Sequence, residues 1–366
     1  MEQPLAPWSV CNLAAVNLAT MANKELGTVD YDQLRKTVEI GVRMQDNVID
    51  STPYFLKENE KQALGERRVG LGVMGLHDLL IYCGARYGSD KGNEIVEKVF
   101  ETIATTAYRT SIKLASEKGS FPFLIGKDDT ETMQLRQNFI NTGFMKKMPE
   151  DIRQDVLKYG IRNSHLLTVA PTGSTGTMVN VSTGLEPYFS FSYFRSGRLG
   201  KFIEVKADIV QEYLDKHPEA EGNLPEFFVS SMELTPEEHA DVQCIIQRWV
   251  DSSISKTVNA LRGYNVSQVQ AVYERLYKGG AKGGTVYVDG SRDAQVLSLT
   301  AEDNTDSTSD SELNLYSNDA DVTATSDVVY GSELGNTCPI CREGEVKEIG
   351  GCNSCDTCGM QLKCGL

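Results

Sequence analysis

A stretch near the end of the chain limits what the whole sequence can fold into. Residues 293–336 carry ten acidic side chains and no lysine or arginine, and serine, threonine and asparagine fill much of the rest. Like charges repel one another, and so few apolar side chains cannot bury enough surface to offset the entropy lost on folding. We expect a disordered acidic linker here, which divides the chain into a body, residues 1–292, and a tail, residues 337–366.

The tail is rich in cysteine: six of the nine cysteines lie in the last 29 residues, a segment too short to fold around an apolar core alone. Cys338 and Cys341 form one C-x-x-C pair, and Cys355 and Cys358, followed by a glycine, form another. Two cysteines three residues apart in a tight turn point both sulfurs at one ion, and two such turns complete a tetrahedral zinc site. The spacing predicts a small zinc ribbon with these four ligands. The alternative is a disulfide knot in an oxidising compartment.

Two tail cysteines, Cys352 and Cys364, remain outside that ligand set. A thiol pair on a mobile tether can carry reducing equivalents by disulfide exchange, because the tether gives reach and the thiolate is the nucleophile. We interpret these two cysteines as a redox pair, with the alternative that both are incidental.

The body has the pattern of an α/β domain. Asp30 can cap a helix that has Gln33 at its third position, and a second long helix is predicted over about 93–117 with Gly119 as its stop. Short apolar runs at 166–169 and 285–288 each lead into a glycine-containing turn and predict strands. Helices that alternate with such strands favour an α/β fold over an all-helical one.

Charge and hydropathy exclude several classes of protein. The net charge is −15, with 51 acidic against 36 basic residues, which argues against nonspecific binding to nucleic acid or to an anionic membrane surface. No apolar run approaches the ~20 residues of a membrane span. The first residues lack the basic and apolar segments of a signal peptide. We expect a cytoplasmic protein that binds neither nucleic acid nor membranes.

The turn after the predicted strand 166–169 is a candidate anion site. Residues 170–177 read APTGSTGT, a small, hydroxyl-rich, glycine-containing run that can present backbone N–H groups and hydroxyls to a phosphate. The run lacks the lysine of a P-loop, so it is not a Walker site. An ordinary strand-to-loop turn explains the spacing alone equally well.

Residues 70–75 read GLGVMG and match the G-x-G-x-x-G fingerprint of dinucleotide-binding proteins. The preceding residues are charged and polar rather than strand-like, and the run continues into an apolar, helix-like segment. We therefore interpret it as close helix packing with glycines at the contact, and reject a dinucleotide site. The four histidines are dispersed, and we expect each to be structural.

Eight blocks of the body resemble the large (catalytic) chain of ribonucleotide reductases, beginning just after that family's radical-cysteine motif. They occur in order and cover nearly all of residues 2–292. The blocks are 2–5 (EQPL), 10–18 (VCNLAAVNL), 46–50 (DNVID), 67–75 (RRVGLGVMG), 170–174 (APTGS), 184–187 (GLEP), 251–259 (DSSISKTVN) and 287–292 (YVDGSR). The tail resembles the zinc-ribbon end of the adenosylcobalamin-dependent (class II) reductases.

The resemblance implies a reaction and roles for individual residues. In the family, a cysteine thiyl radical removes the ribose 3′ hydrogen and a glutamate takes the 3′-OH proton. Two further cysteines supply the electrons with which the 2′-OH is replaced by hydrogen, and they become a disulfide. Glu2 falls on the glutamate of the family motif N-P-C-G-E, so it is the candidate general base. Cys11 falls on one reducing cysteine, and the loop Pro171, Thr172, Gly173, Ser174 and Thr175 falls on the family's substrate phosphate loop. Cys352 and Cys364 would re-reduce the active-site disulfide and pass the oxidation to thioredoxin or glutaredoxin.

The resemblance also implies an incomplete site. Met1 stands where the motif has its glycine, so the radical cysteine and the second reducing cysteine are expected in an N-terminal partner half. The expected fold is α/β, the second half of a ten-stranded α/β barrel, followed by the acidic linker and the zinc ribbon. A single tyrosine, Tyr287, stands where class I chains carry a relay pair, which together with the ribbon favours class II and adenosylcobalamin. The alternative function is a non-catalytic remnant or a zinc-ribbon interaction module.

Overall fold

The computed structural model describes residues 4–197, 200–289, 291, 297–298, 333–338, 341, 343–349, 352–358 and 360–364. For residues 192–206, 297–298, 349, 352 and 361–364 the description is limited to the backbone. The chain forms two compact units, Met1–Tyr193 with Val205–Gln295, and Phe194–Glu204 with Val296–Leu366, and each is described by itself. Glu2 and most of the predicted linker lie outside the described residues.

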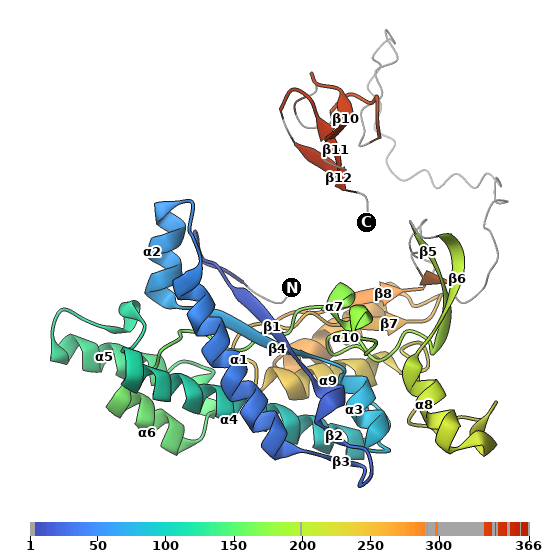
Figure 1. The fold of residues 1–366 in the computed structure, drawn as a ribbon, viewed down its shortest axis with the longest axis horizontal. Coiled ribbons are helices and arrows are strands. Elements are labelled where there is room, and N and C mark those ends of the chain that lie inside the picture. Colours follow the sequence, from blue (N-terminus) through green and yellow to red (C-terminus); the bar gives the residue numbers. More distant parts are fainter. Residues whose placement is uncertain are drawn as a thin grey trace. The chain divides into compact units, whose positions relative to one another are not determined.

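Five parallel strand segments, linked by pairings and isolated bridges, form the centre of the first unit. Figure 1 shows β1, β4, β7 and β8 there. β1 (Asn12–Asn17) pairs with β4 (Val69–Met74), with Asn12 opposite Val69. β4 bonds to segment 166–169 through a parallel bridge from Leu71 to Leu167, and Val169 bridges in parallel to Ile254. The chain then continues into β7 (Thr257–Ala260), which pairs in parallel with β8 (Thr285–Val288). The predicted strand at 285–288 is confirmed, and the segment predicted at 166–169 lies in the middle of the array.

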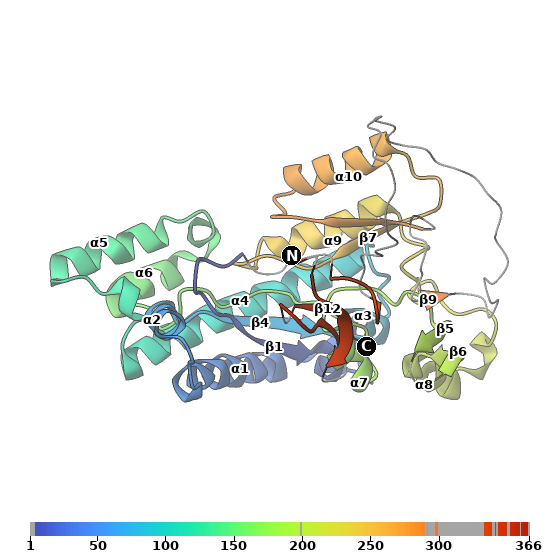
Figure 2. The same cartoon turned by 90° about the horizontal axis from the view of Figure 1, so that it is seen from above.

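Helices cover one face of this array. In both views α1 (Tyr31–Ser51) lies along β1 and β4, with α4 (Asp90–Lys118) beside it and α9 (Pro236–Gln247) beyond (Figures 1 and 2). Val69, Leu71 and Val73 face the helices, because a Cβ on Gly41 of α1 would lie 3.3 Å from a Leu71 methyl carbon. The alternate residues of β4, Gly70 and Gly72, therefore face the opposite side of the array.

The remaining elements are short. The other α-helices are α2 (Lys57–Glu66), α3 (Leu76–Tyr82), α5 (Asp129–Ile140), α6 (Glu150–Tyr159), α7 (Gly173–Met178), α8 (Asp208–Lys216) and α10 (Val266–Lys278). The 3₁₀ turns are Leu18–Met21, Pro122–Leu124, Met145–Lys147 and Pro218–Ala220, and β2 (Ala22–Asn23) pairs with β3 (Thr28–Val29). No helix among the described residues is long and apolar enough to cross a membrane.

The second unit contains two small sheets. β5 (Ser192–Gly197) lies between β6 (Gly200–Lys206) and β9 (Leu297–Ser298). β10 (Val346–Ile349), β11 (Cys352–Cys355) and β12 (Gln361–Cys364) form an antiparallel sheet, and the predicted zinc ligand Cys355 is the last residue of β11.

The two predicted helices are confirmed, and their boundaries follow from their caps. The Asp30 side chain accepts a hydrogen bond from the Gln33 amide at the start of α1, as expected. α4 begins three residues before the predicted start, because the Ser89 side chain caps it by accepting from the Gly92 amide. It ends at Lys118, where Gly119 has a positive φ.

The helical interpretation of residues 70–75 is wrong, because residues 69–74 form strand β4. All six residues of β4 are buried, so the strand shows neither the alternation of a half-buried strand nor a helical period. A strand, a turn and a helix thus do follow one another here, as in a dinucleotide fold. However, the Gly75 amide donates to the Ser182 carbonyl and the His77 amide donates to the Ser182 hydroxyl, so a loop of the chain itself occupies the start of α3.

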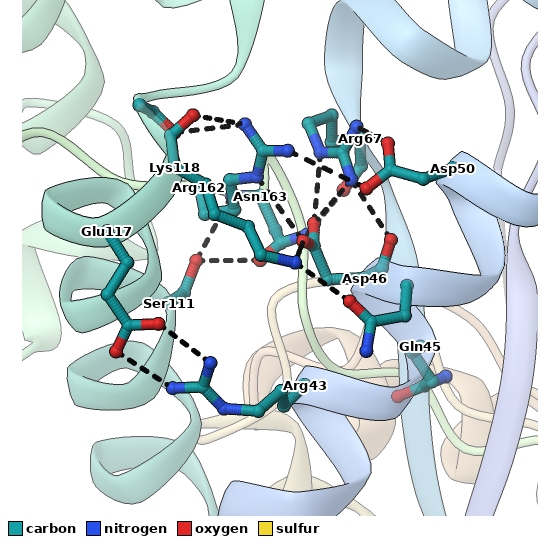
Figure 3. Close-up of polar contacts among 12 residues, drawn as sticks. Arg43, Gln45, Asp46, Asp50, Arg67, Ser111, Glu117, Lys118, Arg162 and Asn163 are labelled. Atoms are coloured by element: carbon teal, nitrogen blue, oxygen red, sulfur yellow. Dashed lines mark hydrogen bonds and ion pairs between the residues drawn. The ribbon is translucent and has the colours of Figure 1, made fainter.

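A buried carboxylate joins α1 to the strand array (Figure 3). Asp46 is fully buried, and its Oδ1 accepts from Arg67 Nε at 2.9 Å and from Asn163 Nδ2 at 3.1 Å. Arg162 Nε lies 3.3 Å from the other oxygen, and Arg67 Nη1 also donates to Asp50 at 2.7 Å. Arg67 lies two residues before β4, and Asn163 lies three residues before segment 166–169. The Asp46 side chain therefore fixes the starts of two neighbouring strands.

We expect Asp46→Ala to lower the free energy of unfolding by about 3–5 kcal/mol, because it leaves the Arg67 guanidinium buried with Asp50 as its remaining carboxylate partner. Urea unfolding followed by circular dichroism measures the change. Asp32→Ala is the matched control, since it removes an exposed ion pair with Arg35 on the same helix and should cost less than about 1 kcal/mol. Equal losses in the two variants would contradict this role for Asp46.

Candidate functional site

Cys11 lies at the amino end of β1, on the face of the array opposite the helices. A Cβ at Gly70 would lie 2.8 Å from Cys11 Sγ and 2.7 Å from both Leu13 Cδ2 and Thr168 Cγ2. Side chains from β1 and from segment 166–169 therefore converge over a glycine of β4. The Cys11 thiol is half-buried and Leu13 is 51% exposed, so this face is accessible.

The two glycines of β4 create the room for this arrangement. A Cβ at Gly72 would lie 2.5 Å from the Thr168 carbonyl oxygen, closer than non-bonded atoms approach. Any larger residue at either position would push the Cys11 thiol or segment 166–169 away. The GLGVMG run thus has a packing role, as predicted, although between strands rather than between helices.

The predicted phosphate loop follows segment 166–169 directly. Thr172 has a φ of +49° and precedes α7, and its hydroxyl accepts from the Gly184 amide at 2.7 Å. Gly173, Ser174 and Thr175 are exposed, and among the described contacts their amides donate to no group, whereas the Gly176 amide bonds to the Thr172 carbonyl. Unpaired amides in the first turn of a helix attract anions.

The return side of this loop is held by residues that the sequence analysis assigned no function. The Ser182 amide donates to Asp78 Oδ2 at 2.8 Å, and the Tyr188 hydroxyl donates to Asp78 Oδ1 at 2.7 Å. The Tyr188 amide donates to His77 Nδ1 at 3.1 Å, and burial lowers the pKa of His77 to about 3, so the ring stays neutral. His77 is structural, as expected. No spacing in the sequence links it to residues more than a hundred positions away.

Two of the blocks quoted above meet beside this loop. Glu186 of the GLEP block pairs with Lys256 of the DSSISKTVN block, with Oε2 and Nζ 2.7 Å apart. The Lys256 side chain is fully buried and the Glu186 side chain is 26% exposed. Lys256 is part of the DSSISKTVN block, and the sequence alone predicts no role for it.

The four predicted zinc ligands lie together in the second unit. The sulfurs of Cys338, Cys341, Cys355 and Cys358 all lie within 4.8 Å of one another. Cys338 Sγ and Cys358 Sγ are 3.8 Å apart, and Cys341 Sγ and Cys355 Sγ are 3.6 Å apart. A tetrahedron with Zn–S bonds of ~2.3 Å has S···S edges of about 3.8 Å, so this donor set fits zinc.

Backbone amides around the cluster favour thiolates. The Gly344 amide donates to Cys341 Sγ at 3.4 Å, and the Thr357 and Cys358 amides donate to Cys355 Sγ at the same distance. Hydrogen bonds from the amides of Glu343 and Gly344 lower the pKa of the Cys341 thiol to about 6. Metal ligation requires the thiolate, so these amides favour binding of the ion.

The remaining predicted site residues are described only in part. Cys352 and Cys364 are Cα partners in the antiparallel pairing of β11 with β12, and only their backbone is described. Glu2 lies outside the described residues. Cys11 and the phosphate loop belong to the first unit, and the tail cysteines belong to the second.

The fold and the site combine a parallel α/β array, a half-buried cysteine and a glycine-containing loop with exposed amides in one unit, and a cluster of four cysteines that fits zinc in the other. The family model for the ribonucleotide reductase barrel domain matches residues 1–287. The chain belongs to the ribonucleotide reductase family.

Curated relatives agree with this family. The chain is 30% identical over 319 residues to the vitamin B12-dependent ribonucleoside-diphosphate reductase of Mycobacterium tuberculosis strain H37Rv, covering 82% of this chain and 41% of that protein. It is 31% identical to the protein of the same name from Thermoplasma acidophilum, covering 82% and 38%. It is 28% identical to the ribonucleoside-diphosphate reductase subunit alpha of Chlamydia pneumoniae, covering 68% and 26%. The chain therefore spans about two fifths of the length of the first two relatives.

We expect the purified protein to carry one zinc ion per chain, and Cys355→Ser to lose it, because three thiolates and a hydroxyl hold zinc less tightly than four thiolates. Elemental analysis by plasma mass spectrometry measures the ratio. Cys244→Ser is the control, since that half-buried cysteine lies outside the cluster. Zinc retained in full by Cys355→Ser would exclude the predicted ligand set.

We expect Gly70→Ala to destabilise the fold by about 1–3 kcal/mol, because the added methyl group overlaps three side chains. Displacement of the thiol should also make Cys11 react faster with iodoacetamide, measured by peptide mass spectrometry. Gly143→Ala is the control, since a Cβ there meets no atom within 4 Å. An unchanged alkylation rate together with unchanged stability would show that Gly70 does not set the position of the thiol.

Proposed function

We propose that this chain is part of a ribonucleotide reductase, with Cys11 as one of the two reducing cysteines and residues 171–175 as the loop that holds the substrate phosphate. The observation that carries the proposal is the common face shared by the Cys11 thiol and Thr168, three residues before that loop, around Gly70. A substrate anchored by its phosphate at the loop can extend its ribose along this face toward Cys11.

The residues of this chain account for part of the chemistry. Conversion of a ribonucleotide to a deoxyribonucleotide releases the 2′-oxygen as water, and two thiols supply two electrons and two protons as they become a disulfide. Cys11 provides one of these thiols. Glu2 is the proposed base that holds the 3′-OH proton. The radical cysteine and the second reducing thiol come from the rest of the barrel, in the same chain or in another.

The surface next to β1 supports docking of that other half. Within the described part of the chain β1 pairs on one side only, with β4, and an unpaired edge is a template for another strand. Ile40, Met44 and Val48 of α1 are 68%, 53% and 42% exposed and recur every four residues. At 100° per residue Met44 and Val48 lie about 100° and 140° around α1 from Arg43, which bonds to Glu117 of α4. Ile40 borders α4, since it lines a pocket with Thr106 and Thr110. Met44 and Val48 thus lie on a flank turned away from α4. We propose that these five strands complete a ten-stranded barrel there.

The names of the relatives support a cobalamin-dependent reaction on ribonucleoside diphosphates. Adenosylcobalamin would supply the radical that starts the reaction at the radical cysteine. Tyr287, on β8, is the single tyrosine at the position where class I chains have two. We assign no described residue to cobalamin contacts.

We propose that Cys352 and Cys364 re-reduce the disulfide that forms at Cys11 and then pass the oxidation to thioredoxin or glutaredoxin. Residues directly opposite in an antiparallel pair have Cα atoms about 4.5–5.5 Å apart, which is within the span of a disulfide. The register of β11 and β12, which makes Cys352 and Cys364 partners, supports a reversible disulfide between them.

The test is reconstitution of the reaction. The chain is mixed with a barrel half that carries the radical-cysteine motif, adenosylcobalamin, dithiothreitol and cytidine diphosphate, and deoxycytidine diphosphate is measured. We expect Cys11→Ser to abolish product, and Glu2→Gln to slow it by about 10²–10⁴-fold. Cys244→Ser is the control for thiol loss away from the site and should leave the rate unchanged.

The tail cysteines are tested in the same assay with a change of reductant. The double variant Cys352→Ser/Cys364→Ser should lose turnover with thioredoxin and keep it with dithiothreitol, because a small thiol reaches the disulfide directly. Full activity of Cys11→Ser would overturn the proposed role of Cys11. No product from any mixture, despite a stable complex, would favour a non-catalytic remnant.

A further inference from the structure

The ammonium group of Lys256 is buried and fully bonded. Nζ donates to Glu186 Oε2 at 2.7 Å and to the Thr257 carbonyl at 2.8 Å, and it lies 2.9 Å from His239 Nδ1. An ammonium has three N–H groups, so all three are used. Lys256 therefore has no donor left for a ligand, and it acts on the site only through the groups that it holds.

His239 serves as an acceptor for this lysine. Its Nε2 lies 2.9 Å from the Ser231 carbonyl, which can only accept, so Nε2 carries the hydrogen and Nδ1 accepts from Lys256. Burial and the positive charge of Lys256 lower the pKa of His239 to about 3, so the ring stays neutral. Burial lowers the pKa of Lys256, and the carboxylate of Glu186 acts against this shift by stabilising the ammonium form.

Glu186 connects this lysine to the phosphate loop. Its Oε2 accepts from Lys256, and its Oε1 accepts from the Thr257 amide at 2.6 Å, so one carboxylate spans the start of β7. Two residues before it, the Gly184 amide donates to the Thr172 hydroxyl, and Thr172 is the residue that opens α7. Lys256 is thus linked to the loop by its contact with Glu186, by the chain from Glu186 back to Gly184, and by the contact of Gly184 with Thr172. Thr172 directly precedes the exposed amides of 173–175.

The cost of burying this ion pair indicates a role beyond stability. A buried ion pair is often no more stabilising than apolar side chains of the same volume, because both charges must be taken out of water. What the pair adds is a fixed geometry: a bridging carboxylate with two defined donors allows the 184–186 segment one position against β7.

We propose that Lys256 is a positioning residue, which together with Glu186 holds the return side of loop 171–184 against β7 and so keeps the amides of Gly173, Ser174 and Thr175 arranged to bind phosphate. This inference rests on the proposed function of that loop as the substrate phosphate site. Lys256 does not touch the phosphate itself.

The test measures binding of cytidine diphosphate and of cytidine to the full chain by calorimetry. Lys256→Met keeps the approximate length of the side chain and removes its charge. We expect it to weaken diphosphate binding by about tenfold or more, because the amides of residues 173–175 would no longer point at the phosphate. Cytidine, which lacks phosphate, should bind equally to both proteins. Lys256→Met/Glu186→Leu, which removes both charges, should regain stability without regaining diphosphate binding.

Ile140→Ala controls for stability loss alone. Ile140 is buried at the end of α5, which packs against α6, so its truncation should lower the unfolding midpoint and leave diphosphate binding unchanged. Hydrogen exchange gives a second measurement: residues 171–184 should exchange faster in Lys256→Met, and α4 should not.

The outcomes separate the two proposals. A wild-type chain that binds cytidine diphosphate no better than cytidine overturns the proposed phosphate loop. A wild-type chain that binds the diphosphate, with Lys256→Met binding it equally and exchanging equally at 171–184, overturns the positioning role of Lys256 alone. Restored diphosphate binding in the double variant would also overturn it, since the charge pair would then be dispensable.

Discussion

The buried carboxylate of Asp46 is the contact on which the strand array depends. A charge without access to water must be matched by donors, and Asp46 has them from Arg67, Arg162 and Asn163. These donors lie just before β4 and segment 166–169. The hydrogen bonds that satisfy the Asp46 carboxylate therefore place two strands against α1. Because a shift of one residue would turn every side chain to the other face, this fixed start also decides which residues face Cys11.

A second carboxylate fixes the same middle segment from the other side. Asp251 accepts from the Leu166 and Leu167 amides at 2.7 and 3.0 Å, and from the Tyr108 hydroxyl. The segment between β4 and β7 also makes backbone hydrogen bonds to both neighbours, for example from the Leu71 amide to the Leu166 carbonyl and from the Ser255 amide to the Val169 carbonyl. Its register is therefore set by backbone bonds together with charged groups whose partners are specific, in addition to apolar packing, which tolerates small shifts.

Interactions between residues close together in the sequence could be predicted, and interactions between residues far apart in the sequence could not. The Asp30 cap of α1 and the two C-x-x-C turns each depend on residues a few positions apart, and the structure has both. The helical interpretation of residues 70–75 is wrong because a strand that is buried on both faces and contains two glycines lacks the alternating pattern that marks a strand. The bonds from Ser182 to His77 and Asp78 span more than a hundred residues, and no spacing predicts them. Cys11 and the proposed phosphate loop are indicated by resemblance to a family, and the approach of Cys11 to Thr168 around Gly70 appears only in three dimensions.

The positions of the buried charges suggest why the chain keeps them. Asp46 and Arg67 lie at the start of segment 166–169, and Glu186 and Lys256 lie beyond its end, beside the loop that follows it. Apolar side chains could fill both places at similar stability, but they would leave the segment free to slide by fractions of an ångström. In the proposed function this loop aims three amides at one anion, and the proposed reducing cysteine stands at the start of β1, on the far side of β4 from the segment. Such a site cannot tolerate that freedom, because the distance from phosphate to ribose is fixed by the substrate. Charged contacts at both ends hold the segment in one position and one register. The free energy lost in desolvating these charges is offset by the accurate placement of the loop.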